Sequence, residues 1–233
     1  MEPHAEATDP EAPPLPPLWK RAVDTVFSPG AMAEAVAARP AWFMALLVGA
    51  SLVALQTFLV PAEIWEAQFR QNMLNQQQQM PEGFAMSGDM LRISGTIGGV
   101  LVWFVFSFLM AGVVTLIFAF FLGDEGRYTQ YLSVMAHAWL IPAIAGLMLV
   151  PLRIAQGNPQ LTLNLATFFY FLEPGYWKGV LTFLDLSQLW AWAVIAQGVH
   201  VIDRRRSFGS ALTILLVLLL LMALAFGRFM PTT

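Results

Sequence analysis

The chain has 233 residues, of which 58% are hydrophobic and only 12% are charged, and its formal net charge is −3. That charged share is about half the share of a soluble domain, which is about 25%. The composition therefore excludes an ordinary soluble fold. The negative charge and the lack of a basic stripe exclude a nucleic-acid partner. The chain has no cysteine, so disulfides and thiolate metal sites are excluded as well.

The first segment, residues 1–17, contains six prolines and four acids. Because this composition buries little apolar area, we expect a disordered tail. A docking tail for a partner is the functional alternative. The acidic leader also argues against a cleavable signal peptide, which begins with basic residues.

Residues 18–39 are predicted to form two short helices. In Leu18–Phe27 the apolar residues, Trp19 and Phe27 among them, recur at helical spacing, and Lys20 and Arg21 fall on the other face. This pattern is typical of a helix at the headgroup interface, although the same apolar face would also suit packing on a bundle. Ser28 and Pro29 then suit the start of a second helix, which ends before Pro40.

Five long apolar stretches dominate the rest of the chain. They are Ala41–Val60, Ile93–Leu122, Tyr131–Leu152, Gly179–Ile202 and Phe208–Phe229. A helix that crosses a bilayer core of about 30 Å needs about 20 mostly apolar residues. The sequence therefore predicts an all-α, polytopic integral membrane protein with a five-span domain over residues 40–230. The apolar segment 161–173 is too short to cross and is expected to be interfacial or re-entrant.

The basic residues predict the orientation. With the N-terminus inside, the inner segments hold seven Lys and Arg residues and the outer segments hold five. The triplet Arg204–Arg206 carries most weight because it lies in a very short loop. We expect the N-terminus in the cytosol and the C-terminus outside. The alanine, leucine and glycine usage is typical of a bacterial protein, which would place the chain in the inner (plasma) membrane.

Three ionisable side chains lie in or near the predicted spans. Asp185 belongs to the fourth stretch, His137 to the third, and His200 to the inner end of the fourth. Such groups are costly in a bilayer and default to functional hypotheses. Helical spacing puts Gln188 and Asp203 on the same face as Asp185, with His200 at its margin. We expect these polar groups to point into the bundle, where other helices can satisfy them.

The depth of these groups limits their pairing. At about 1.5 Å per residue, His137 and Asp185 should lie roughly 10 Å apart along the membrane normal. Gln197 is the better depth match for His137. Three roles stay open for this set: hydrogen bonds that fix helix packing, a proton or ion pathway, and a metal site made by His137 and His200 with Asp203 or Asp124. No cofactor is predicted.

Two further features concern interfaces and catalysis. Gly95 and Gly99 form a GxxxG pattern, which suits either a dimer face or close packing within the chain. Ser133 and His137 are one turn apart, but no nucleophile elbow or third orienting acid accompanies them. The chain also has no glycine loop of the phosphate-binding type. The sequence therefore predicts a protein that is not an enzyme.

Three ordered segments carry a family resemblance. The first is Val26-Phe27-Ser28-Pro29, before the first span. The second runs from Gly123 through Tyr128 and Gln130 to Pro142. The third is Leu184-Asp185-Leu186, followed by Trp190 and Gly198.

Together with the span layout, these segments resemble the Yip family of membrane proteins, named in eukaryotes for interaction with Ypt/Rab GTPases. The resemblance implies a five-helix bundle with a cytosolic N-terminus. It also implies roles in membrane organisation or trafficking in eukaryotes, and no settled biochemical activity in prokaryotic members.

The leading functional expectation is a membrane scaffold or adaptor. The alternative is a translocator of a small solute, a lipid or an ion that uses the polar faces of the third and fourth spans. The expected partners are membrane lipids and either a second copy of the chain or another protein.

Overall fold

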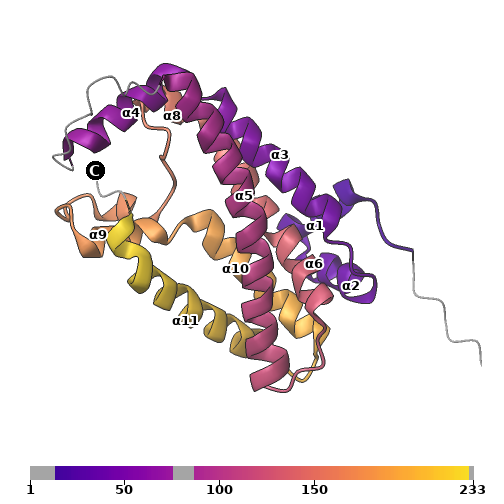
Figure 1. The fold of residues 1–233 in the computed structure, drawn as a ribbon. Helices are drawn as coiled ribbons and strands as arrows, with labels where there is room; N and C mark the ends of the chain where they lie inside the picture. The colour runs from indigo at the N-terminus through magenta and orange to yellow at the C-terminus, as the bar shows by residue number, and fades with distance from the viewer. Residues whose placement is uncertain (1–13, 76–86, 231–233) are drawn as a thin grey trace, which may run out of the picture.

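The protein is all-α in the computed structural model, which describes residues 14–75 and 87–230 (Figure 1). Most of the predicted tail, residues 1–13, lies outside the described residues. The helices are α1 (Leu18–Phe27), α2 (Pro29–Ala38), α3 (Phe43–Leu59), α4 (Ala62–Asn75), α5 (Gly88–Thr115), α6 (Tyr128–Ala138), α7 (Leu140–Met148), α8 (Val150–Gln156), α9 (Tyr176–Phe183), α10 (Leu186–Ile202) and α11 (Phe208–Phe226). Three shorter helical segments complete the structure: the π-helical η1 (Leu116–Phe121), which continues α5, and the 3-10 segments η2 (Leu165–Phe169) and η3 (Gly227–Phe229).

Among the described residues, the helices that are long and apolar enough to span a membrane are fewer than the five apolar stretches. Within the described ranges, three helical segments are long and apolar enough to cross a bilayer: Gly88–Phe121, Tyr128–Met148 and Phe208–Phe229. A fourth results if α3 and α4, which meet at a bend of 83°, count as one broken span. The fourth stretch contributes α10, which has 17 residues and is shorter than a full span. The all-α membrane bundle is confirmed, but the count of five spans is not.

The fourth stretch is not one helix, which corrects the prediction for Gly179–Ile202. Helix α9 ends at Phe183, and α10 begins at Leu186. Between them Asp185 has extended backbone, with φ −78° and ψ 138°, and its carboxylate accepts hydrogen bonds from the amides of Ser187 and Gln188. Aspartate competes with helical hydrogen bonding inside a helix and stabilises a helix start as an N-cap. Asp185 therefore starts α10 rather than lying within a span.

Prolines divide the third stretch. Pro142 stands four residues after Ala138, where α6 ends, and it has no N–H for the Ala138 carbonyl. Pro151 likewise follows Leu147 by four residues, close to the end of α7. The stretch is therefore three consecutive helices, of which α6 and α7 together provide the span.

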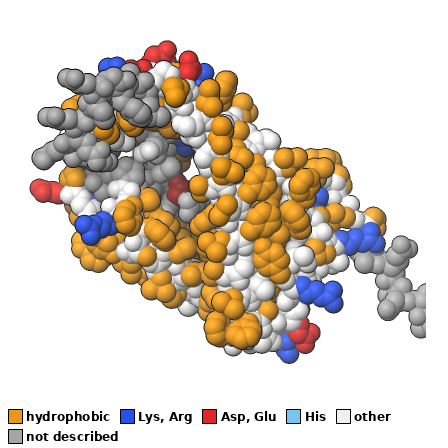
Figure 2. Space-filling view, viewed as in Figure 1, with side chains coloured by type: hydrophobic (Ala, Val, Ile, Leu, Met, Phe, Trp, Pro, Cys, Tyr) orange, Lys and Arg blue, Asp and Glu red, His pale blue; other side chains and the backbone are white. Residues whose placement is uncertain are grey.

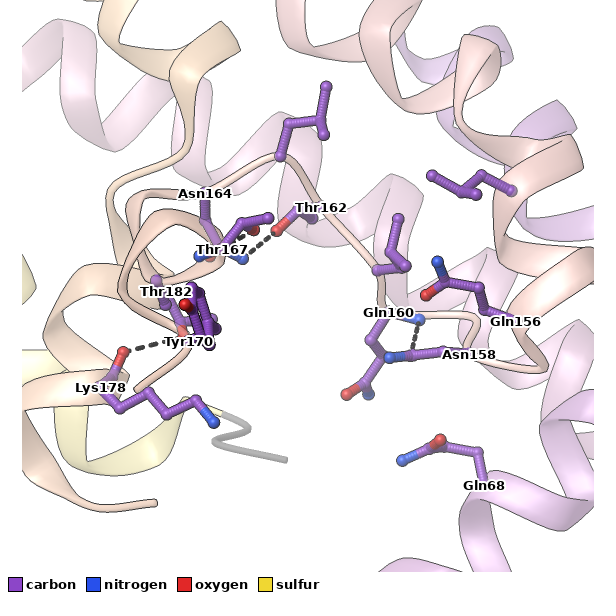
Figure 3. A pocket seen from close by; sticks show the side chains of 14 residues that line it. Gln68, Gln156, Asn158, Gln160, Thr162, Asn164, Thr167, Tyr170, Lys178 and Thr182 are labelled. Carbon is purple, nitrogen blue, oxygen red and sulfur yellow. Dashed lines mark hydrogen bonds between the residues drawn. The ribbon is translucent and has the colours of Figure 1, made fainter. Parts of the chain in front are cut away.

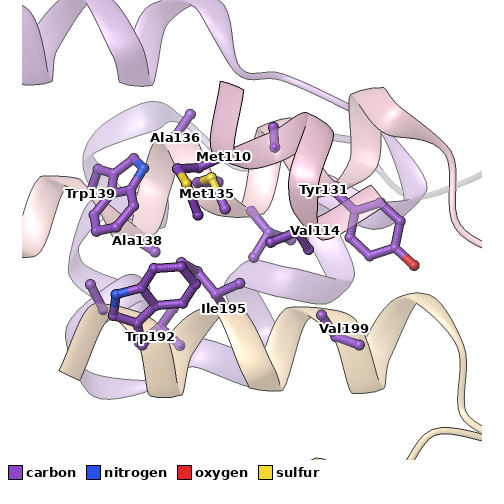
Figure 4. Packing of buried hydrophobic residues seen from close by; sticks show 14 of the residues in the cluster. Met110, Val114, Tyr131, Met135, Ala136, Ala138, Trp139, Trp192, Ile195 and Val199 are labelled. Atoms are coloured by element: carbon purple, nitrogen blue, oxygen red, sulfur yellow. The ribbon is translucent and has the colours of Figure 1, made fainter. Parts of the chain in front are cut away.

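The core lies between α6 and α10 (Figure 4). Trp139 and Trp192 meet edge to face, with ring centroids 5.7 Å apart. The two helices approach closely because Gly198 lies against Val134, where a Cβ would overlap a valine methyl group. Helix α2 packs on both α6 and α10, so the N-terminal leader is part of the bundle.

The glycines of the GxxxG pattern lie against α3 of the same chain. Gly95 lies opposite Thr57 and Gly99 opposite Val53, and α3 packs along α5. This favours intramolecular packing over a dimer face at these two positions. Figure 2 shows hydrophobic side chains covering the outer sides of α5 and α11 instead, as expected for lipid-facing helices.

Candidate functional site

The least expected polar contact joins α1 to α6. Arg21 is 5% exposed, and its Nη1 lies 2.9 Å from Nε2 of His137. The guanidinium also donates to the carbonyls of Ala41 (3.3 Å) and Pro16 (3.0 Å). His137 is 0% exposed, and its Nδ1 is 2.7 Å from the carbonyl oxygen of Ser133.

The donor and acceptor roles in this contact follow from its chemistry. A guanidinium only donates, so Nε2 of His137 must accept from Arg21. The Nδ1 atom then carries the proton and donates to Ser133. His137 is therefore a neutral histidine with both ring nitrogens engaged. We call its hydrogen bond with Arg21 the Arg21–His137 contact.

Two expectations are wrong here. Arg21 does not join Lys20 on a face toward the headgroups, because its side chain is buried against α6. Gln197 is not the partner of His137, whose two nitrogens are already used; it lies beside Gly30 of α2. Arg21 and Thr25 are four residues apart and both are buried, so they lie on the inward face of α1.

Charged groups gather where α10 ends. Asp203 accepts from the backbone of Glu125 (3.0 Å) and pairs with Arg205 (2.8 Å). Arg206 pairs with Asp124 (2.7 Å). We call Asp124, Glu125, Asp203, Arg205 and Arg206 the ionic cluster. It joins the connection before α6 to the connection between α10 and α11.

Hydrogen bonding in this cluster shifts its ionisation. The side-chain and backbone donors of Arg205 hold the pKa of Asp203 well below its usual range. Asp124 raises the pKa of Arg206 through their hydrogen bond. The third arginine of the triplet, Arg204, pairs with Glu34 of α2 at 2.6 Å. All three arginines that predicted the orientation are therefore ion-paired.

His200 serves this same connection. Its Nδ1 lies 2.6 Å from the carbonyl of Arg206. His137 is engaged with Arg21 and Ser133, so the two histidines do not share a site. Within residues 14–75 and 87–230, no group of three His, Asp or Glu side chains is arranged to hold a metal ion. The metal alternative for His137, His200, Asp203 and Asp124 is not supported by this arrangement.

Beyond the opposite end of α10 lies a hollow with many neutral polar side chains, part of which is drawn in Figure 3. One cavity of about 410 Å³ lies between α4, the segment 156–170 and α9. A second, of about 700 Å³, reaches Asp185 and Gln188. The two share Gln160, Thr162 and Thr182. We call them together the polar cavity.

The lining defines what this cavity suits. In Figure 3 the side chains of Gln68, Gln156, Gln160 and Lys178 border one open space. Amides and hydroxyls both donate and accept hydrogen bonds, so they can replace the water shell of a neutral polar molecule. The sequence did not reveal this cavity, because uncharged amides scattered over a loop and several helices leave no periodic signal.

Two charged side chains near this cavity, Arg153 and Asp185, are held by hydrogen bonds. Arg153 donates to Gln56 (3.0 Å) and to the carbonyl of Leu161 (3.0 Å). Asp185 forms no ion pair within 4 Å among the described residues; its carboxylate is used by Ser187 and Gln188. The predicted face of α10 is real, since Trp192, Ala196 and Val199 are buried, but its aspartates cap the two ends.

These features define a helical integral membrane protein whose leader is folded into its bundle. The family model described as the Yip1 domain matches residues 23–227, which is most of the chain. The protein therefore belongs to the Yip1 family, as the three ordered segments indicated. No curated protein and no solved structure matches the chain.

Proposed function

We propose that the protein is a non-enzymatic scaffold or adaptor that organises membranes or membrane proteins. The main support is the space between the polar groups. A transport path through the spans would need polar or open space between His137 and Asp185. That region holds Trp139, Trp192 and Ile195, each at most 4% exposed. A close-packed core suits a protein that presents surfaces better than one that conducts.

The side-chain geometry also supports a non-enzymatic role. The Ser133 hydroxyl donates to the carbonyl of Thr129 at 2.6 Å, and Nδ1 of His137 faces the Ser133 carbonyl rather than its hydroxyl. This pair therefore lacks the hydrogen bond that a nucleophile and its base require. Family membership is consistent with this role.

The proposed place of the protein is the bacterial inner membrane, with the N-terminus in the cytosol and the C-terminus outside. Its proposed partners are lipids and a second copy or another protein. Single cysteines at Ser207 and at Glu173 test the orientation, because the chain has no native cysteine. An impermeant thiol reagent added outside should label the Glu173 site and not the Ser207 site. The reverse pattern would overturn the orientation.

A flux measurement tests the functional proposal. Purified protein in sealed vesicles should leak protons and small polar solutes no faster than empty vesicles. Photo-crosslinking side chains at the exposed Glu125 and Arg127 should at the same time capture one defined membrane protein or a second copy. Flux above empty vesicles, abolished by Asp185→Asn, would replace the scaffold with the translocator.

The translocator remains the second candidate because of one observation. The polar cavity reaches both Asp185 and Gln188, which the translocator hypothesis assigns to its path. Binding of a small polar solute or a lipid headgroup there would be its first step. Gln188→Ala should then lower transport, with Gln197→Ala, on the same helix beside α2, as the matched control.

A further inference from the structure

The Arg21–His137 contact fixes the depth of α1. His137 is nine residues after Tyr128 and eleven before Met148, the two ends of the apolar segment formed by α6 and α7. At 1.5 Å per residue, these distances are roughly 14 Å and 16 Å. A bilayer core of about 30 Å therefore has its centre close to His137.

Helix α1 must lie close to the same depth. The six bonds from the Cα atom of Arg21 to its Nη1 atom span at most roughly 7 Å at about 1.5 Å per bond. Since Nη1 is 2.9 Å from Nε2 of His137, the Cα atom of Arg21 lies within roughly 10 Å of that ring nitrogen. Helix α1 also packs against α7, the second half of the same span, which places it within the hydrocarbon layer rather than on its surface. The carbonyl of Ala41, just before α3, is bonded by the same guanidinium and lies at this level too.

The charged side chains of α1 all have polar partners, as burial at this depth requires. Arg21 has two carbonyls and the His137 ring as acceptors. Lys20 pairs with Asp24 at 2.7 Å. These are the charged residues of α1, so each charged side chain of the helix has a hydrogen-bond or ion-pair partner.

The exposed face of α1 is apolar. Trp19, Val23 and Phe27 follow one another at intervals of four residues and are 70%, 49% and 80% exposed. The opposite face holds the buried Arg21 and Thr25. A water-facing amphipathic helix has the reverse arrangement, with its apolar side inward.

The exposed face continues a surface that meets lipid. Helix α1 contacts the side of α3, and α3 begins with the exposed Phe43 and Met44 directly after Ala41. At this depth, acyl chains are the partner that suits the exposed apolar side chains of both α1 and α3. We propose that α1 is inserted into the leaflet on its side of the membrane. Trp19, Val23 and Phe27 lie against acyl chains, and the Arg21–His137 contact holds α1 at that depth. This inference does not depend on the scaffold role.

Spin-label accessibility tests the insertion in the full chain reconstituted in lipid nanodiscs. Nitroxides at single cysteines replacing Trp19, Val23 and Phe27 are compared with a lipid reference at Phe120 and a water reference at Arg204. The expected result is strong collision with oxygen and weak collision with a water-soluble nickel chelate, as at Phe120. Chelate accessibility equal to that at Arg204 would overturn insertion. Weak collision with both reagents, with spin–spin broadening, would show a second copy on this face and overturn the lipid partner.

A second pair of variants tests the hydrogen bond. Arg21→Met should shift the Val23 label toward the water reference, because α1 loses its attachment to α6. His137→Gln, which keeps an acceptor, should leave the label unchanged. Lys20→Met, which removes the basic residue paired with Asp24 and leaves the bond to α6 in place, is the matched control. The Phe120 label, measured in each variant, reports whether the bundle is still folded. An unchanged Val23 label in a folded Arg21→Met variant would exclude the contact as the depth-setting element.

Discussion

The two ends of α10 each carry an aspartate, yet they are built in opposite ways. Asp203 lies in the ionic cluster, where Arg205 and the backbone of Glu125 satisfy it. Asp185 caps the other end through Ser187 and Gln188 and borders the polar cavity. One end is closed by ion pairs between connections, whereas the other is left open among neutral amides.

The ionic cluster therefore stabilises the fold, whereas the polar cavity is a candidate binding surface. Ion pairs such as Asp124–Arg206 join segments that are 82 residues apart, so they hold the connections in place. The polar cavity has fewer such links: the side chains of Gln156 and Lys178 have no hydrogen-bond partner among the described residues, and the amides of Gln68 and Asn164 bond to residues close in sequence. Substitutions should therefore reduce stability at the ionic end more than at the polar end.

The largest effect is expected from Arg206→Met. It leaves the carboxylate of Asp124 without its bidentate partner, which should cost about 2–3 kcal/mol of unfolding free energy, below the 3–5 kcal/mol of a fully buried pair. Thermal unfolding in detergent measures this loss. The double variant with Asp124→Leu should recover part of it. If Arg206→Met alone unfolds like the wild type, the ionic cluster does not stabilise the fold.

A smaller effect is expected in the core between the two ends. Gly198→Val places a branched side chain where Val134 already packs, and such overpacking costs about 1–3 kcal/mol. Gly209→Val is the matched control, since a Cβ at Gly209 meets nothing within 4 Å. Equal unfolding temperatures for the two variants would contradict the close α6–α10 contact.

At the open end, Asp185→Leu removes the N-cap of α10 and should cost about 1 kcal/mol. Asp185→Asn keeps a side-chain acceptor and should be nearly neutral, since asparagine caps as well as aspartate. Parallel measurement of unfolding and of a cellular phenotype checks both variants. A stable Asn variant that has lost its function would argue for the translocator.

The smallest effect concerns pH. The folded pKa of Asp203 is lowered, so its stabilisation is present above the unfolded pKa, about 3.9. As the pH falls below that value the unfolded chain takes up the proton first, and the stabilisation is lost as the pH falls through the folded pKa. Asp203→Asn should flatten the acid limb of a plot of unfolding temperature against pH. An unchanged limb would remove Asp203 from the cluster's energetics.

The comparison also shows where local sequence signals were sufficient. Helix α1 runs over Leu18–Phe27, the range that its spacing predicts, and the family resemblance is confirmed by the Yip1 match. The prediction of one span over the fourth stretch was wrong because hydropathy averages over Asp185. A single capping side chain is enough to start a new helix there.

The sequence by itself determined the solvent, the helical class and the family, because apolar length and backbone hydrogen bonding within a helix are local properties. Only the tertiary structure decided which face of α1 turns inward, since Arg21 and His137 are 116 residues apart. It alone also paired the arginine triplet with acids from α2 and the α5–α6 connection. The polar cavity likewise arises from packing, because its amides come from α4, α8, α10 and the segment between α8 and α9, and these meet only when the helices are assembled.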